Sequence, residues 1–418
     1  MRPSVRQPGP LTFLNAEHDR HLCARNPEQF CPRGAGRFKA RNSLTLNGID
    51  ALERHLANVC KKVLAGIGRI IPDQKLEGLA LGGGYGRGEG GVLKTPAGDQ
   101  PYNDLEFYVF VRGHLWLNER RYAKSLHQLG EKLSLVAGVE LEFKITSAVK
   151  LRRSPQNLFY HDLVMGHRWL LGDDRLLAGC EHHGDARAIR LSEATRLLMN
   201  RCSGLLFARE KLEHERFPAE DADFVGRNIA KTELALGDAV LIAFGKYHWS
   251  CLERGQRLND LATTEHLPWL DEVRQRHAAG VEFKLQPHRS SLSRDALQKH
   301  FREVSSLALR VWLWLENRRL DCDCRSVADY ASSCINKWPD TNRWRNRLAN
   351  VRVFGLRTLL LSRNSRHPRE RILNALAFLL WARAETSPAL TRKVQRELLW
   401  TEPTAMIPAY RERWSRAS

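Results

Sequence analysis

Two acidic residues at alternate positions of the chain stand just after a cluster of glycines. Asp104 and Glu106 lead into the apolar run 107–110, and the glycines fall within residues 82–91. Because side chains of a strand alternate between its faces, the two carboxylates are expected on one face, with Leu105 on the other. Neighbouring acids repel each other unless a cation lies between them, and Mg²⁺ prefers such oxygen ligands. We therefore expect Asp104 and Glu106 to hold Mg²⁺ (or Mn²⁺).

The glycine cluster itself has the composition of a phosphate-binding loop. An apolar run, 79–81, enters it, and Arg87 and Glu89 follow its first glycines. Glycines lack a Cβ, so their backbone N–H groups can approach phosphate oxygens closely. Arg87 is expected to pair with a phosphate or to brace Glu89, and Glu89 is expected to anchor the loop. The predicted phosphate-binding glycines are Gly82, Gly83 and Gly84.

A second strand carries two further acids. Residues 139–145 alternate strictly between apolar and polar side chains, which is the pattern of a half-buried strand. Glu140 and Glu142 share the polar face, and either could take a proton from an attacking group. The alternation alone does not choose between them.

Residues 83–89, with the sequence GGYGRGE, and the acid pair Asp104 and Glu106 together resemble a known family. This combination is similar to the nucleotidyltransferase superfamily, which includes DNA polymerase β, the aminoglycoside nucleotidyltransferases and the PII-protein uridylyltransferases. The resemblance covers residues 60–180 and is closest to the uridylyltransferase branch. Two departures are Gly84, where many members have Ser, and Glu106, where many have Asp. No His-Asp pair of the uridylyltransferases' hydrolase domain is found.

The resemblance implies a fold, a reaction and roles for several residues. It implies a DNA polymerase β-like catalytic domain that moves a nucleoside monophosphate from a nucleoside triphosphate, ATP above all, to an acceptor, using two metal ions. In the family a third carboxylate comes from a later strand, which implies that role for Glu140 or Glu142. A helical domain presents a basic residue to the triphosphate, and Lys231 is the candidate here.

The order of patterns along the chain predicts an α+β fold. A nucleotidyltransferase-type mixed β-sheet with flanking helices is expected first, followed by an all-α C-terminal region. Helical periodicity is expected over residues 47–70 and 119–136, and it dominates after residue 188. We predict a basic arm at 1–45, a catalytic domain at 46–182, a helical substrate-binding domain at 183–336 and a helical lobe at 337–418.

The chain is strongly basic and lacks the patterns of a membrane or secreted protein. Its net charge of +19 and pI near 9.8 favour polyanionic partners or anionic substrates. No apolar run approaches the roughly 20 residues that span a bilayer, and no signal-peptide core precedes the first domain. Nine irregularly spaced cysteines do not predict a disulfide framework. A cytoplasmic protein without membrane contact is expected.

Three functions are compatible with these observations. The first is a Mg²⁺-dependent nucleotidyltransferase whose acceptor is a protein, a small molecule or an RNA end. The second is a catalytically inactive nucleotide sensor or antitoxin-like module on the same fold, and the third is a basic nucleic-acid-binding protein. Pyrophosphate release distinguishes the first from the second, and salt-dependent nucleic-acid binding that does not need Asp104 marks the third.

Overall fold

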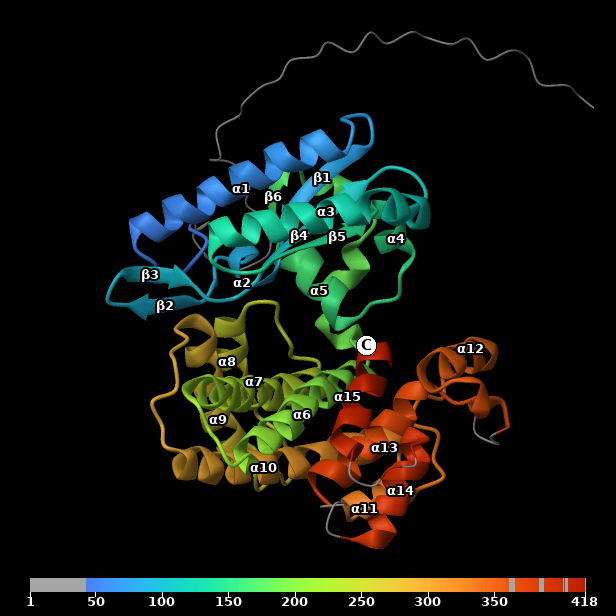
Figure 1. The fold of residues 1–418 in the computed structure, drawn as a ribbon. Coiled ribbons are helices and arrows are strands. Elements are labelled where there is room, and N and C mark those ends of the chain that lie inside the picture. The colour runs from blue at the N-terminus through green and yellow to red at the C-terminus, as the bar shows by residue number, and fades with distance from the viewer. Residues whose placement is uncertain (1–42, 361–364, 383–386, 401, 403–404, 418) are drawn as a thin grey trace, which may run out of the picture. The chain divides into compact units, whose positions relative to one another are not determined.

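The computed structural model describes residues 43–360, 365–382, 387–400, 402 and 405–417, and most of the predicted arm at 1–45 lies outside them. Residues 43–418 group into one unit by their internal contacts. Its first part is an α+β region with a mixed sheet and flanking helices, and its second part is all-helical (Figure 1). The predicted fold class is therefore confirmed. The predicted domain boundaries stay predictions.

A four-stranded sheet forms the centre of the first part. Its order is β5-β4-β1-β6, in which β1 runs antiparallel to β4 and β6 while β5 runs parallel to β4. A parallel pair needs a long crossover, and a helix, α3 (Leu115–Ala137), provides it. The strands are β1 (Leu76–Leu81), β4 (Leu105–Val111), β5 (Leu141–Thr146) and β6 (Arg168–Leu171).

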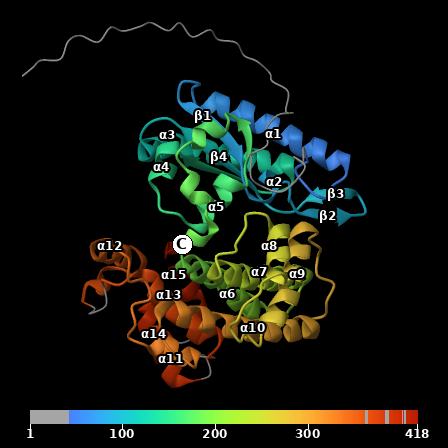
Figure 2. The same cartoon turned by 180° about the vertical axis from the view of Figure 1, so that it is seen from behind.

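Both faces of the sheet are covered, and the alternation along β4 divides its side chains between them. Phe107 and Val109 join the apolar cluster under α1 (Asp50–Ile70) and α3. Tyr108 and Phe110 join a second cluster with α4 (Ala148–Arg153) and α5 (Leu158–Met165). Figure 2 shows α5 on the opposite side of the sheet from α1. Glu106 lies near the start of β4, ahead of Tyr108 and Phe110 on the same face.

The segment between β1 and β4 differs from the simple loop that the sequence suggests. The glycine cluster begins with one helical turn, α2 (Gly83–Gly86), and a hairpin follows, formed by β2 (Val92–Thr95) and β3 (Gly98–Pro101). The helix expected over 47–70 begins at Asp50. Its N-cap position is Ile49.

The helical part shares one large apolar cluster, which runs from Ile189 to Tyr410. In it α6 packs against α7, and both pack against α10. Among the described residues, no helix is both long and apolar enough to cross a membrane. The helices are α6 (Leu191–Glu213), α7 (Ala219–Ala243), α8 (Cys251–Asn259), α9 (Leu270–Leu285), α10 (Arg294–Leu320), α11 (Val327–Ser332), α12 (Arg343–Phe354), α13 (Pro368–Leu380), α14 (Pro388–Leu398) and α15 (Met406–Ala417).

The single helical turn α2, called the glycine turn, packs tightly against the end of β1, and this contact gives a first prediction. A Cβ on Gly86 would lie 2.2 Å from the carbonyl oxygen of Leu81, which is backbone and cannot move aside cheaply. Gly86→Ala is therefore expected to lower the free energy of unfolding by about 1–3 kcal/mol, measured by urea denaturation. The control is Gly68→Ala in α1, where no atom lies within 4 Å, and there Ala should stabilise slightly. Equal stability of the two variants would contradict the prediction.

Candidate functional site

Three carboxylates meet where β4 and β5 begin. The parallel register places Glu106 beside Glu142, and Asp104 precedes β4 on the same side. One oxygen from each of the three can lie within 4.8 Å of the others. Leu105 and Phe107, by contrast, are fully buried in the core. The structure thus brings Asp104, Glu106 and Glu142 together.

Glu140, the other candidate for the third carboxylate, is placed differently. It precedes β5 and is exposed, and its backbone carbonyl accepts a hydrogen bond from the N–H of Leu105 at 2.9 Å. Its side chain lines a surface hollow of about 420 Å³ between α3 and β5, which Glu142 also borders. Of the two glutamates, only Glu142 belongs to the cluster of three among the described residues.

The carboxylate cluster is electrostatically strained. Partial loss of water contact raises the pKa of Asp104, and repulsion from Glu106 and Glu142 raises it further. A raised carboxyl pKa means that the charged form is disfavoured, so a cation placed here is bound favourably. Carboxylate oxygens are the ligands that Mg²⁺ prefers, and three of them within reach of one point fit one such ion.

A lysine that the sequence analysis missed already lies in the cluster. The Nζ of Lys144 is 3.0 Å from Glu142 Oε2 and 3.5 Å from Glu106 Oε1. Partial burial opposes its charge, but attraction to Glu106 and Glu142 outweighs burial and raises the pKa of Lys144. The hydroxyl of Tyr108 donates to the other oxygen of Glu106 at 2.7 Å. Strand alternation could have found Lys144, which is two residues after Glu142.

The glycine turn lies directly beside these acids. The N–H of Gly82 donates to the carbonyl of Glu106 at 2.9 Å, which ties the turn to β4. A Cβ on Gly82 would lie 2.4 Å from the ring of Tyr108, so a larger residue would push that ring away. Gly83 has a positive φ of 61°, which favours glycine. Gly83 and Gly84 also line a cavity that Asp104 and Glu106 border.

Arg87 is paired within the protein. Its Nη1 lies 3.2 Å from Asp162 Oδ2 of α5, and the hydroxyl of Tyr247 donates to the same carboxylate at 3.2 Å. Burial opposes the guanidinium charge, but Asp162 more than compensates and raises the pKa of Arg87. Among the described residues Arg87 forms an ion pair with Asp162 and none with Glu89, so the brace to Glu89, one of its two expected roles, is not present as a direct ion pair. Arg87 still lines the cavity.

Glu89 anchors the loop to the helical part of the protein. Its buried carboxylate accepts hydrogen bonds from the Ser250 hydroxyl and, at 2.9 Å, from the Cys251 N–H, where α8 begins. Burial alone would raise the pKa of Glu89, but these hydrogen bonds and the charge of Arg87 hold it below its ordinary value. Both bonds satisfy groups that would otherwise be unpaired at a helix N-terminus.

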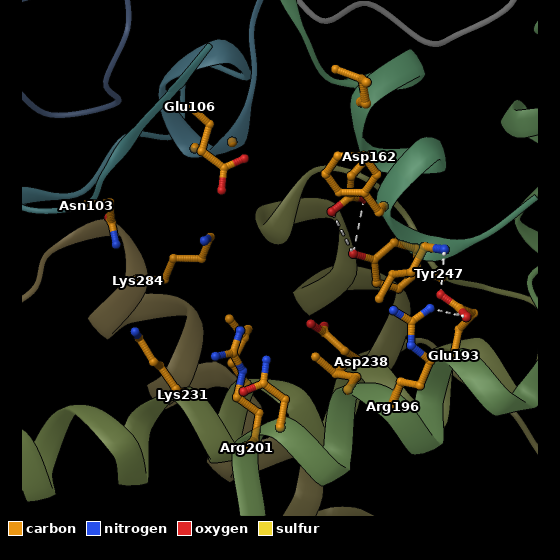
Figure 3. Close-up of a pocket in the computed structure, with 18 of the residues that line it drawn as sticks. Asn103, Glu106, Asp162, Glu193, Arg196, Arg201, Lys231, Asp238, Tyr247 and Lys284 are labelled. Atoms are coloured by element: carbon orange, nitrogen blue, oxygen red, sulfur yellow. Dashed lines mark hydrogen bonds and ion pairs between the residues drawn. The ribbon is translucent and has the colours of Figure 1, made fainter. Parts of the chain in front are cut away.

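A cavity of about 690 Å³ separates the acids from a basic wall (Figure 3). Asp104 and Glu106 line one side of it, together with the glycine turn. Figure 3 shows a group of basic side chains across the cavity from Glu106. The basic wall consists of Arg201 of α6, Lys231 of α7 and Lys284 of α9.

These three cations make no ion pair with any carboxylate in the described part of the chain. Loss of water contact and the charges of Arg201 and Arg227 lower the pKa of Lys231 to about 8. Burial likewise lowers the pKa of Arg201 and of Lys284. Asp104 attracts Arg201 and Lys231, and Asp238 attracts Arg201, but neither acid forms an ion pair with them among the described residues. Their loss of water contact therefore favours an anionic ligand at this wall. The sequence identified Lys231 but missed Arg201 and Lys284, because only the packing of three helices brings them together.

Other charges near the cavity neutralise one another. Asp238 is 3.1 Å from Arg254 Nε and 3.1 Å from His277 Nε2, so Arg254 and His277 hold the pKa of Asp238 low despite burial. At the far end of the cavity Glu193 pairs with Arg196 at 2.8 Å. Arg369 and Trp414, from the last helices, line the cavity as well. The basic wall is therefore a local excess of positive charge among paired groups.

Comparisons with protein-family models, with curated proteins and with solved structures find no match to this chain. The α+β architecture and the cluster of Asp104, Glu106 and Glu142 are properties of the structure itself. Assignment to a family depends on the motif alone, so the function is argued below from the site.

The anchor at Glu89 gives a second prediction. Glu89→Gln keeps only one of the two oxygens that accept from the Ser250 hydroxyl and the Cys251 N–H, so the variant should lose about 1–3 kcal/mol of unfolding free energy at pH 7. The folded-state pKa of Glu89 is depressed, so its contribution is present above its ordinary value of 4.5 and is lost as the pH falls through the folded value. The stability difference should therefore shrink below about pH 4.5.

Urea denaturation across pH 3–7 measures this difference. The matched control is Glu131→Gln, an exposed glutamate of α3 that pairs only with His127 among the described residues, at 3.5 Å. The control should change stability little at any pH. A difference for Glu89→Gln that stayed constant down to pH 3 would contradict the assigned role.

Proposed function

We propose that the protein is a Mg²⁺- or Mn²⁺-dependent nucleotidyltransferase that moves a nucleoside monophosphate from a nucleoside triphosphate to an acceptor. ATP is the expected donor. The observation that carries the proposal is the opposition, across one cavity, of Asp104 and Glu106, two of the three clustered carboxylates, and three cations that form no ion pair among the described residues. A triphosphate complexed with a divalent ion complements both walls, because its metal meets the acids and its anionic tail meets the basic wall.

The carboxylates Asp104, Glu106 and Glu142 would hold the divalent ion. Such an ion polarises phosphoryl oxygens and neutralises charge that develops on them. The glycine turn leaves space beside Glu106. A Cβ on Gly83 would occupy that space, 3.7 Å from the Glu106 side chain. Gly83 and Gly84 can therefore border the phosphates closely, as the motif suggests.

The proposed transfer forms one bond and breaks one. An acceptor oxygen attacks the α-phosphorus, the bond from the α-phosphorus to the bridging oxygen of the β-phosphate breaks, and pyrophosphate leaves with the electron pair. The acceptor's proton passes to Glu142 or to water beside it. Arg201, Lys231 and Lys284 would stabilise the charge that builds up on the departing pyrophosphate.

The acceptor is a protein, a small molecule or an RNA end, and the site favours no single one of them. The cavity continues past the acids to Phe159, Arg196 and Trp414, so it has room for more than the triphosphate. Binding of nucleotide without pyrophosphate release would assign the protein to the alternative class of nucleotide sensors.

Loss of one carboxylate gives the third prediction. Even residues that only support metal ligands contribute about 10–100-fold to activity, so Asp104→Asn should lower nucleotidyl transfer by at least about a hundredfold. The assay follows pyrophosphate release and label transfer from each α-labelled triphosphate to pools of protein, RNA and small molecules. Glu140→Gln is the matched control and should retain most activity, because Glu140 is outside the cluster. Absence of pyrophosphate release with every triphosphate would contradict the proposal.

The lowered pKa of Lys231 gives the fourth prediction. Free Lys231 loses its proton near pH 8, whereas a bound triphosphate favours the charged form. Affinity for a non-hydrolysable ATP analogue should therefore be constant below pH 7 and fall as the pH rises past 8. Calorimetric titration measures it. Lys231→Met should bind about tenfold more weakly at pH 7 and lose most of this pH dependence. A wild-type protein with constant affinity from pH 7 to 9 would exclude Lys231 from the site.

A further inference from the structure

Lys144 supplies a positive charge within the cluster of acids. Lys144 Nζ contacts two of the three carboxylates, Glu142 at 3.0 Å and Glu106 at 3.5 Å. It also lies over the rings of Tyr108 and Phe159, at 5.7 and 5.9 Å from their centroids. Two acids and two aromatic faces therefore surround the ammonium group, and both kinds of contact favour a cation at this point.

These contacts occupy three of the six oxygens of the three carboxylates. One oxygen of Glu106 accepts from Tyr108, and the other faces Lys144. One oxygen of Glu142 also faces Lys144. The carboxylate of Asp104 and the second oxygen of Glu142 make none of these contacts, and the contacted oxygens of Glu106 and Glu142 each keep a further lone pair for a metal. Three carboxylates less one lysine leave a formal charge of −2, which one divalent ion neutralises.

We propose that Lys144 is a permanent cation of this site and takes the place of one of two metal ions, so that the nucleotide complex holds a single divalent ion. The inference depends on the proposed function, because it concerns the metal content of the nucleotide complex. A second Mg²⁺ would have to displace an ammonium group held by two carboxylates, at a point that already carries one positive charge. Lys144 is a positioning residue here: it fixes Glu106 and Glu142 and limits the number of ions.

The alternative is that the metal ions displace Lys144 when nucleotide binds. Lys144 is partly exposed, with about 38% of its side chain accessible, so its side chain is free to swing away. The two arrangements differ in the number of metal ions, and counting them separates the two. Charge complementarity favours the single ion, since the cluster with Lys144 in place needs only two further positive charges.

The experiment counts Mn²⁺ bound to the full-length protein by electron paramagnetic resonance, at a saturating concentration of a non-hydrolysable ATP analogue. The number of Mn²⁺ ions is divided by the number of protein-bound nucleotides. The wild type is expected to bind one Mn²⁺ per bound nucleotide. Lys144→Met keeps the length of the side chain but removes its charge, and it should bind two. Lys144→Arg, which keeps the charge, should bind one.

A control lysine variant, a check of folding and a measurement of nucleotide binding accompany the count of Mn²⁺ ions. Lys124→Met, an exposed lysine of α3, should bind one Mn²⁺ like the wild type. Circular dichroism shows whether Lys144→Met is folded, and the number of ions in the wild type provides the test if it is not. Two ions per nucleotide in the wild type, or an unchanged number in Lys144→Met, would overturn the role of Lys144 alone. Failure of the wild type to bind the ATP analogue would overturn the proposed function as well.

Discussion

The mutual repulsion of Asp104, Glu106 and Glu142 is the constraint on which the site depends. The backbone fixes it, because β4 and β5 are hydrogen-bonded in parallel register and both enter a filled core. Charges about 5 Å apart repel by about 3 kcal/mol at an effective dielectric constant near 20. The strands cannot separate to relieve this energy without losing the packing of Phe107 against Phe143. The fold therefore favours a cation beside the acids, and Lys144 supplies one positive charge there.

The opposite wall of the cavity shows the same principle with the sign reversed. Most charged groups around it are matched, as in the pair of Arg87 with Asp162 and the pair of Arg254 with Asp238. Each of these pairs lies within one part of the described chain, and the hydroxyl of Tyr247, which donates to Asp162, links the two parts beside the cavity. Arg201, Lys231 and Lys284 are left without such partners among the described residues. Under the proposed function, one ligand that carries both signs of charge would complement the two walls.

Much of the first part of the fold could be predicted from local patterns, because those patterns are the direct cause of the structure. Alternation placed Asp104 and Glu106 on one face, and the strict period of 139–145 predicted β5, although that strand begins two residues later. The two candidates Glu140 and Glu142 could not be separated, because they share a face. The strand register, which places Glu142 beside Glu106, separates them.

The remaining residues of the site could not be predicted because they come together only in three dimensions. Asp162, Arg201 and Lys284 belong to three separate helices, and nothing in their local sequence indicates a shared cavity. The hairpin of β2 and β3 was hidden by its glycine and proline content, which resembles an irregular turn. Lys144 could have been found from the alternation, but a lysine beside acids resembles an ordinary solvent-exposed strand face.

The anchor formed by Glu89 limits the modularity of this architecture. Glu89, in the glycine-rich motif, accepts hydrogen bonds at the start of a helix more than 150 positions later in the chain. The loop therefore depends on contacts with both parts of the protein. The α+β half could not be grafted onto a different helical partner unless that partner offered a hydroxyl and a free N–H at the same place. Recombination between such proteins would therefore have to exchange the loop and the start of α8 together.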